Sequence, residues 1–190
     1  MEREPRFIVY TVCEEYNELL SKGDTQVRQS TADKKTRPFA GILFTFENRN
    51  YFVPLTSPKP KHLTMKNSKC IYKLDEGHRG IIDFCKMIPV PDSQLEKIDF
   101  SKRKKTHPHN YSLLQNQLRL VNKDREIIRK KAKKFYEDYF SNKISKKIKE
   151  NCVNFPRANK IHDRWIEREN IYKKGNSQDN KKDKSKDFSR

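Results

Sequence analysis

The stretch that decides the fold is "RPFAGILFTFENRNYFVPLTSPKPKH", residues 37–62. Its two apolar runs, 39–47 and 50–55, are rich in aromatic and β-branched residues and flank an Asn-rich turn. Because asparagine tolerates the positive φ of tight turns, the pattern predicts a β-hairpin. Pro54 lies near the end of the second strand, and two further prolines prevent its continuation. The polar segment 56–62 is therefore expected to be exposed where the strand stops.

Strand-forming residues are also frequent on both sides of the hairpin. Residues 6–12 predict a strand, 13–23 a short helix and 24–37 a polar loop. The runs 69–74 and 80–85 flank "DEGHRG" and predict a second hairpin. A meander of about five or six antiparallel strands follows from this pattern.

In the second half of the chain, the apolar residues recur with the period of a helix. Between 111 and 151, apolar residues recur at steps of three and four and predict one helical stripe: Leu114, Leu118, Val121, Ile128, Ala132, Phe135 and Tyr139. Residues 173–190 are polar and of low complexity, so a disordered basic tail is expected. The expected organisation is one α+β domain over 1–172, mainly β in 1–92 and mainly helical in 110–172.

The charge of the chain indicates its class of partner. Its 190 residues contain 43 Lys and Arg against 25 Asp and Glu, which gives a net charge of +18. This excess is spread along the chain and favours a nucleic acid over a membrane surface. No apolar run approaches the ~20 residues needed to span a bilayer. The first residues are unlike a secretory signal, so a cytoplasmic protein is expected.

Metal and cofactor chemistry is not expected. The four cysteines have spacings that match no zinc pattern and are interpreted as reduced, mostly buried side chains. The chain has five glycines and contains no phosphate-binding glycine loop. Neither a metal ion nor a nucleotide cofactor is therefore predicted.

The polar segment that follows the first hairpin carries chemistry suited to a phosphate. RNA supplies its own nucleophile, the 2′-hydroxyl, so an enzyme needs only proton transfer and donors for the phosphorane oxygens. Ser57 and Thr56 provide hydroxyl donors, Lys59 a compact positive charge, and His62 a group that titrates near neutrality. Lys61 adds surface charge. The ordinary alternative is a turn in which the hydroxyls close local hydrogen bonds.

Three segments together carry a resemblance to a known family. The opening segment, "KMIPVP" (86–91) and "LLQNQLRLVNKDREII" (113–128) resemble the ToxN/AbiQ family. These proteins are endoribonuclease toxins of type III toxin–antitoxin systems that also act in phage abortive infection. The resemblance runs from about Phe7 to about Ile166, and its most specific part is "PLTSPK" (54–59).

The resemblance implies both a fold and a mechanism. It implies a compact barrel-like antiparallel sheet decorated by helices, similar to the MazF/Kid toxins. It also implies metal-independent RNA cleavage that leaves a 2′,3′-cyclic phosphate. The implied antitoxin is a small repeated RNA that folds into a pseudoknot. The toxin would cut the RNA precursor and be held inactive in a closed ring of alternating protein and RNA.

The family's site residues can be placed on this chain. By resemblance they fall on Ser57, Thr56, Lys59, Arg37, Tyr16 and Gln117. Arginine keeps its proton at ordinary pH, so Arg37 favours phosphate anchoring over proton transfer. Gln117 is a candidate for packing or RNA contact, and His62 is kept as a further catalytic candidate.

The basic helical half supplies candidate RNA contacts. With two lysines of the β-rich half, the candidates are Lys61, Lys73, Lys130, Lys131, Lys133, Lys134, Lys146 and Lys147. Tyr72 and Phe84 are candidates for stacking on unpaired bases. A solvated basic face is the ordinary alternative for these lysines. For the whole protein, the alternatives are a non-catalytic RNA-binding module and a type II toxin neutralised by a protein.

Overall fold

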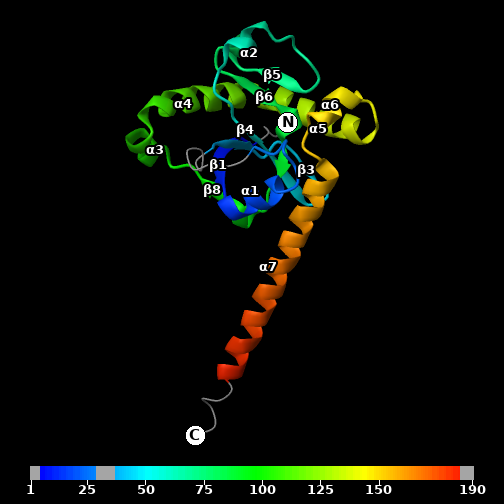
Figure 1. Ribbon diagram of the computed structural model, residues 1–190. Helices are drawn as coiled ribbons and strands as arrows, with labels where there is room; N and C mark the ends of the chain where they lie inside the picture. The colour runs from blue at the N-terminus through cyan, green and yellow to red at the C-terminus, as the bar shows by residue number, and fades with distance from the viewer. Residues whose placement is uncertain (1–4, 29–36, 185–190) are drawn as a thin grey trace.

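The computed structural model describes residues 5–28 and 37–184 of the chain. A mixed body of short strands and helices carries one long helix that projects from it (Figure 1). The strands are β1 (Ile8–Val12), β2 (Phe39–Gly41), β3 (Thr45–Phe46), β4 (Arg49–Pro54), β5 (Ile71–Lys73), β6 (Ile81–Asp83), β7 (Ile88–Pro89) and β8 (Leu95–Lys97). The helices are α1 (Glu14–Ser21), α2 (Pro60–Thr64), α3 (Phe100–Thr106), α4 (Pro108–Lys123), α5 (Arg125–Phe140), α6 (Lys146–Glu150) and α7 (Phe155–Lys184). Short 3₁₀ helices are η2 (Asp75–Gly77), η3 (Phe84–Lys86) and η4 (Asp92–Gln94).

Both predicted hairpins are present. The first hairpin is built on β4, which pairs antiparallel with β2 and with β3. The turn between β3 and β4 places Glu47 and Asn48 at φ values of 46° and 61°, the left-handed region that asparagine tolerates. The second hairpin, β5 with β6, forms a separate two-stranded sheet. The loop predicted over 24–37 lies partly outside the described residues, which stop at 28 and resume at 37.

The main sheet corrects two expectations. Its described strands form a six-stranded sheet in the order β3-β4-β2-β1-β8, with β7 paired to β4. β3 and β8 stand at opposite ends of this order, so the sheet is open and not closed into a barrel. The sheet is also not a simple meander, because β8 returns to pair with β1 through Tyr10 and Lys97. Local sequence patterns do not encode such long-range pairings. The likeness to the MazF/Kid toxins stays a prediction.

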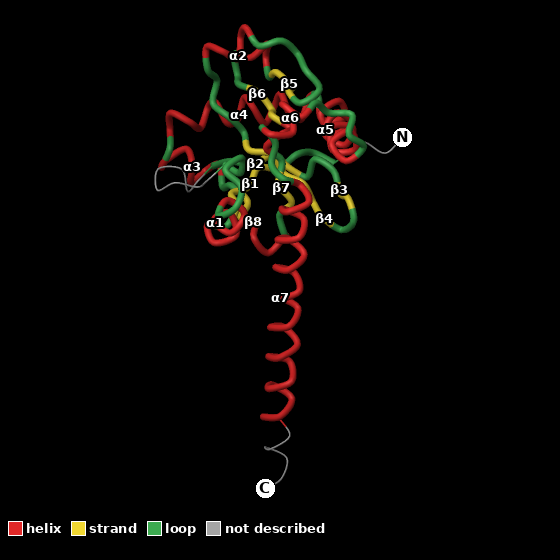
Figure 2. Tube along the Cα trace, turned by 45° about the vertical axis from the view of Figure 1, so that its right-hand side comes forward, coloured by secondary structure: helices red, strands yellow, loops and turns green. Residues whose placement is uncertain are grey.

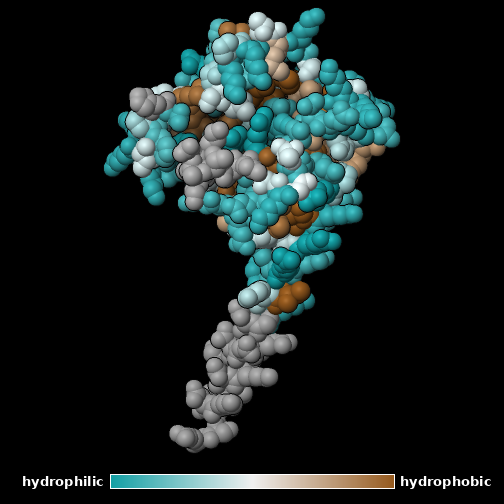
Figure 3. Space-filling model, viewed as in Figure 1, coloured by the Kyte–Doolittle hydropathy of each residue, from teal (hydrophilic) through white to brown (hydrophobic). Residues whose placement is uncertain are grey.

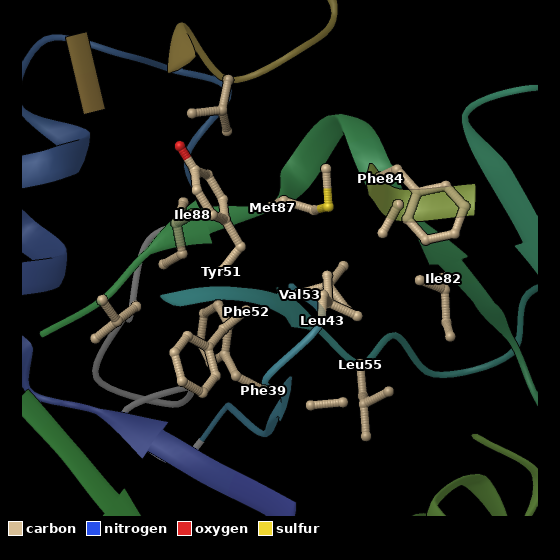
Figure 4. Packing of buried hydrophobic residues seen from close by; sticks show 14 of the residues in the cluster. Phe39, Leu43, Tyr51, Phe52, Val53, Leu55, Ile82, Phe84, Met87 and Ile88 are labelled. Carbon is tan, nitrogen blue, oxygen red and sulfur yellow. The ribbon is translucent and has the colours of Figure 1, made fainter. Parts of the chain in front are cut away.

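The core gathers around β4. Tyr51, Phe52 and Val53 are each fully buried although their side chains alternate between the two faces of the sheet. Figure 4 shows their side chains among those of β2, β6 and β7, with Ile82 and Met87 nearby. The continuous apolar run of β4 is thus explained by burial on both faces. This packing holds the C-terminal end of β4 in place and so determines where the following polar segment begins.

The helical half confirms the predicted apolar stripe. All seven stripe residues are buried or partly buried against the core. The stripe is divided between α4 and α5, which are separate helices with Asp124 between them. In the described part of the chain, no helix is long and apolar enough to cross a membrane.

Helix α7 is the most extended element of the structure. Figures 1 and 2 both show it leaving the body and running away from the sheet. It continues to Lys184, over part of the segment 173–190 that was expected to be disordered. The remainder of that expectation, residues 185–190, lies outside the described residues. On this helix, Ile171 and Tyr172 are 70% and 77% exposed.

Candidate active site and RNA-binding surface

The polar segment 56–62, called the site turn, leads from the end of β4 into α2. Lys59 and His62 close it reciprocally, since the Lys59 N–H donates to His62 Nδ1 (3.2 Å) and the His62 N–H donates to the Lys59 carbonyl (2.8 Å). Pro60 stands in the first turn of α2, where its missing N–H costs nothing. The site turn is therefore a defined structure.

His62 belongs to the framework of this turn. It is 2% exposed, and its Nδ1 is a hydrogen-bond acceptor, which places the proton of the neutral ring on Nε2. Burial, followed by the charges of Lys61 and Lys59, lowers the pKa of His62 below its usual value. The ring is thus neutral at neutral pH, and its role in the structure is to cap α2.

Thr56 is fixed on both sides. Its Oγ1 donates to the carbonyl of Ile81 (2.9 Å), and its own carbonyl accepts from Gln117 Nε2 (2.8 Å). The same Gln117 nitrogen donates to the carbonyl of Arg79 (2.7 Å), and the Gln117 side chain is buried. One amide group therefore ties the end of β4, the β5–β6 hairpin and α4 together.

A glycine allows this close approach. Gly80 has a φ of +94°, and a Cβ built there would lie 2.3 Å from the carbonyl oxygen of Thr56. Any side chain at this position would displace the site turn. The sequence patterns did not assign this supporting role to the β5–β6 hairpin. The signal was present, because "DEGHRG" holds two of the five glycines of the chain.

Ser57 in the site turn and Arg37 before β2 are the next two candidates. Ser57 is exposed directly after the fixed Thr56. The antiparallel register of β2 and β4 pairs Phe39 with Pro54, so that residue 37 comes opposite residue 56. The bond from the Leu55 N–H to the carbonyl of residue 38 (2.8 Å) extends this register beyond the strands. This register places the backbone of Arg37 opposite Thr56, at the start of the site turn.

The electrostatics of Arg37 favour an anion. Its Nε is buried and has no hydrogen-bond partner in the described part of the chain. Burial, followed by repulsion from Arg28, lowers the pKa of Arg37. A buried unpaired donor costs free energy, and so do two neighbouring cations. A bound phosphate would relieve the repulsion between the cations, because its charge is negative.

Tyr16 is not brought to this surface. It is fully buried, its hydroxyl donates to the carbonyl of Pro89 (2.8 Å), and its ring packs edge-on against Trp165. Burial raises the pKa of Tyr16, so its hydroxyl stays protonated. The structure therefore gives Tyr16 a packing role between α1, β7 and α7.

Three of the predicted RNA-binding lysines share a cavity. Lys130, Lys131 and Lys134 line a space of about 760 Å³ together with Lys69 and the ring of Phe135. Lys131 Nζ lies 5.6 Å from the centroid of the Tyr72 ring, which is partly exposed. Positive charge around an apolar floor suits a nucleotide, whose base is flat and whose phosphate is charged. We call this space the lysine cavity.

The remaining candidates are scattered. Lys61 is exposed on α2, and Lys133, Lys146 and Lys147 are exposed on α5 and α6. Lys73 Nζ donates to the carbonyl of Leu63 (3.1 Å) and so braces α2 against β5. Phe84 is fully buried, so the expectation that it stacks on bases is wrong in this conformation. The burial of Gln117 likewise favours packing over RNA contact.

The surface seen in Figure 3 is mostly hydrophilic, with apolar side chains in small separate groups. Within the described residues, no cluster of three or more His, Cys, Asp or Glu side chains could hold a metal ion. The site turn offers the Ser57 hydroxyl and the ammonium groups of Lys59 and Lys61, and Arg37 adds a guanidinium group. These groups can bind a phosphodiester and stabilise negative charge that develops on it.

Comparison with known proteins supplies the remaining context. Residues 8–163 match the family model described as "Toxin ToxN, type III toxin-antitoxin system". The chain is 28% identical over 169 residues to Endoribonuclease ToxN of Bacillus thuringiensis subsp. kurstaki, covering 87% of this chain and 86% of that relative.

Two solved structures share the fold. One, described as selective toxin inhibition by a non-coding RNA pseudoknot, has a TM-score of 0.73 at 25% identity, covering 86% of this chain and 99% of that one. Another, described as a bacterial antiviral system regulated by a processed non-coding RNA, has a TM-score of 0.67 at 25% identity, covering 82% of this chain and 96% of that one.

Proposed function

Because the chain belongs to the ToxN family of type III toxin–antitoxin toxins, we propose that it is an endoribonuclease that acts on cellular and phage RNA in the cytoplasm. Its relative from Bacillus thuringiensis carries that activity in its name, and a structural neighbour belongs to an antiviral system. The arrangement of three residues supports placing the cleavage reaction at the site turn. The exposed Ser57 follows a Thr56 held by two hydrogen bonds, beside an Arg37 with an unpartnered buried Nε.

The proposed reaction uses the nucleophile of the RNA itself. The 2′-oxygen attacks the adjacent phosphorus, the bond from phosphorus to the 5′-oxygen breaks, and a 2′,3′-cyclic phosphate and a 5′-hydroxyl remain. The proton lost from the 2′-hydroxyl is balanced by the proton gained by the 5′-oxygen. Ser57 and Arg37 donate to the non-bridging oxygens, and Lys59 adds positive charge. Fixed donors aimed at developing charge are usually the largest catalytic contribution.

The other residues of the site turn act by position. Thr56 and Gln117 fix the backbone from which Ser57 projects, and His62 caps the helix that carries Lys61 and begins directly after Lys59. Since the neutral His62 ring is buried, it is a positioning residue in this proposal. No step requires a metal ion, because the nucleophile and the charge stabilisation come from the RNA and from these side chains.

The proposed inhibitor is an RNA. A repeated RNA folds into pseudoknots, is cut by the toxin, and holds it in a closed ring of alternating protein and RNA. Support comes from the structural neighbour inhibited by a non-coding RNA pseudoknot and from the net charge of +18. The lysine cavity binds part of this RNA, and the site turn retains the cleaved end as a bound product.

Replacement of one hydroxyl tests this proposal. We expect Ser57→Ala to abolish growth inhibition and to slow RNA cleavage by about a hundredfold or more, because the transition state then has one donor fewer. The free energy of unfolding should change by no more than about 0.5 kcal/mol, since the residue is exposed. RNA affinity should be retained. Cleavage assays, binding assays and denaturant unfolding measure these three quantities.

The exposed Ser112 of α4 provides the control, and Ser112→Ala should cleave at the normal rate. A Ser57→Ala protein that cuts RNA as fast as the parent would contradict the assignment. A loss of stability that matches the loss of activity would assign Ser57 to the turn alone.

A further inference from the structure

A second basic cavity lies apart from the site turn and the lysine cavity. It has a volume of about 530 Å³ and is lined by Arg6, which precedes β1, by residues of α3 and α4, and by the first residue of α5. Arg6, Arg119, Lys123 and Arg125 contribute four positive charges to its wall, and none of its lining residues is acidic. An anion is the ligand that such a wall attracts.

The wall also carries an aromatic ring and a hydrogen-bond acceptor. Phe100 lines the cavity and packs edge-on against Tyr111, with 6.3 Å between ring centroids. Gln115 donates through Nε2 to the Tyr111 hydroxyl (2.7 Å), which orients the amide and leaves Oε1 as an acceptor for a ligand. A flat apolar face next to an amide edge is the combination that recognises an unpaired base.

The back of the cavity is rigid. Asn122 Oδ1 accepts from the Phe7 N–H (2.7 Å), and its Nδ2 donates to the carbonyls of Phe7 (3.2 Å) and Leu118 (3.1 Å). Arg125 Nη1 donates to the Asn122 carbonyl (3.0 Å). These bonds join Phe7, the residue before β1, to α4, so the cavity is formed before any ligand arrives and the ligand need not order it.

We propose that this cavity binds one nucleotide of a single-stranded RNA segment. The base lies on Phe100 with its edge toward Gln115, and a phosphate lies between Arg119 and Lys123. The inference rests on the proposed function, which makes RNA the ligand. Residues 115, 118, 119 and 122 line the cavity, whereas Gln117 points from the other side of α4 to the site turn. A bound strand therefore crosses α4 and is recognised some nucleotides away from the scissile phosphate.

Binding of an uncleavable RNA tests this cavity. The probe is a fluorescein-labelled single-stranded RNA of mixed sequence, methylated at every 2′-oxygen and followed by fluorescence anisotropy at several salt concentrations. Arg119→Gln combined with Lys123→Gln should raise Kd and reduce the log–log salt slope by about 0.7 for each phosphate that is no longer neutralised. Phe100→Leu should raise Kd about tenfold and leave the salt slope unchanged, because it removes stacking and no charge.

Lys160→Gln combined with Arg168→Gln is the matched control. It removes the same charge from exposed positions of α7 that do not line the cavity, so its effect on Kd should be smaller. Equal effects of the two double variants would overturn the proposal, because they would show only the loss of net charge. An unchanged Kd for Phe100→Leu would also overturn it. Since the probe is not cleaved, these outcomes hold whether or not Ser57 proves catalytic.

Discussion

At the scale of single residues, the site turn depends on side chains that do not touch a substrate. Gln117 is the clearest case, since its buried Nε2 donates to two backbone carbonyls from different segments. His62 is another, since its Nδ1 closes the start of α2. Such residues act on catalysis by holding the backbone in place. Their substitution should change both the stability of the fold and the rate of the reaction.

Gln117→Met should lower the free energy of unfolding by about 1–3 kcal/mol, because two partly buried carbonyls lose their donor. It should also lower kcat by about ten- to a hundredfold with little change in KM, since the site turn is displaced while the RNA-binding side chains remain. Denaturant unfolding and steady-state cleavage kinetics measure the two effects. Asn116→Met is the control, because Asn116 is a half-buried amide of the same helix. Normal kcat in a destabilised Gln117→Met protein would assign Gln117 to the fold alone.

His62 should contribute to the pH dependence of the free energy of unfolding. Its pKa is lowered in the folded protein, so the unfolded chain takes up a proton first as the pH falls. Protonation then stabilises the unfolded state, and the free energy of unfolding decreases as the pH drops below about 6.5. His62→Asn keeps an acceptor near the position of Nδ1 but cannot titrate. Its free energy of unfolding should therefore decrease less between about pH 7 and about pH 5.

His78→Asn is the control for the removal of an imidazole, because His78 is exposed. Equal pH dependence in the parent and in His62→Asn would show that His62 is not held neutral in the fold. Chemical unfolding at a series of pH values decides between these results.

At the scale of elements, the lysines of α5 differ in whether they form an ion pair with a carboxylate. Lys134 Nζ lies 2.9 Å from a carboxylate oxygen of Asp138, a residue that is 4% exposed. Removal of Lys134 would leave Asp138 with the more distant Lys69, at 3.8 Å, and so would disturb the fold. Lys130 and Lys131 line the same cavity, and within the described residues neither forms an ion pair with a carboxylate. They are therefore the better test of RNA binding.

Lys130→Gln combined with Lys131→Gln should weaken antitoxin binding and lower its log–log salt slope by about 0.7–0.9 for each phosphate that is no longer neutralised. Cleavage of short RNA should continue, because the site turn is not altered. Lys104→Gln combined with Lys105→Gln removes the same charge from exposed positions of α3 and serves as the control. Filter binding over a range of salt concentrations gives both slopes. Identical slopes for the two double variants would leave the lysine cavity without a specific role.

The long helix α7 extends beyond the region that defines the family. The family match ends at residue 163, whereas α7 continues to Lys184. Its first half is anchored in the body, for example through Trp165, which packs on Tyr16. Its second half projects (Figure 2). Packing against the core therefore stabilises the first half of this helix. The family match covers the beginning of that half, up to residue 163.

At the scale of the whole molecule, the mechanism makes a prediction about the substrate. Cleavage should continue in excess EDTA, because the site turn offers cations and hydroxyls in place of a carboxylate set that binds Mg²⁺. RNA methylated at the 2′-oxygen of the scissile site, and DNA, should resist, because the nucleophile is blocked or missing. Gel analysis of the products and of their end groups checks this expectation. Efficient cutting of the methylated RNA would rule out attack by the 2′-oxygen.

The sequence alone predicted the features that depend on neighbouring residues. The strand 6–12, the two hairpins, the helical stripe and the exposure of Ser57 all follow from local period, turn chemistry and proline positions, and the structure confirms them. The motif "PLTSPK" indicated the family, and the comparison with known proteins confirms it. Such features are local because each is determined by contacts within one segment of the chain.

Only the tertiary structure decided the features that join remote segments. The return of β8 to β1 belongs to an open sheet, where the resemblance implied a barrel-like one. Tyr16, Phe84 and Gln117 are buried, which favours packing or positioning roles for them. The sequence could not show this, because an aromatic or amide side chain has the same local pattern whether it meets water or another segment. Which of the two it meets depends on how distant parts of the chain pack together, and that packing is a property of the whole fold.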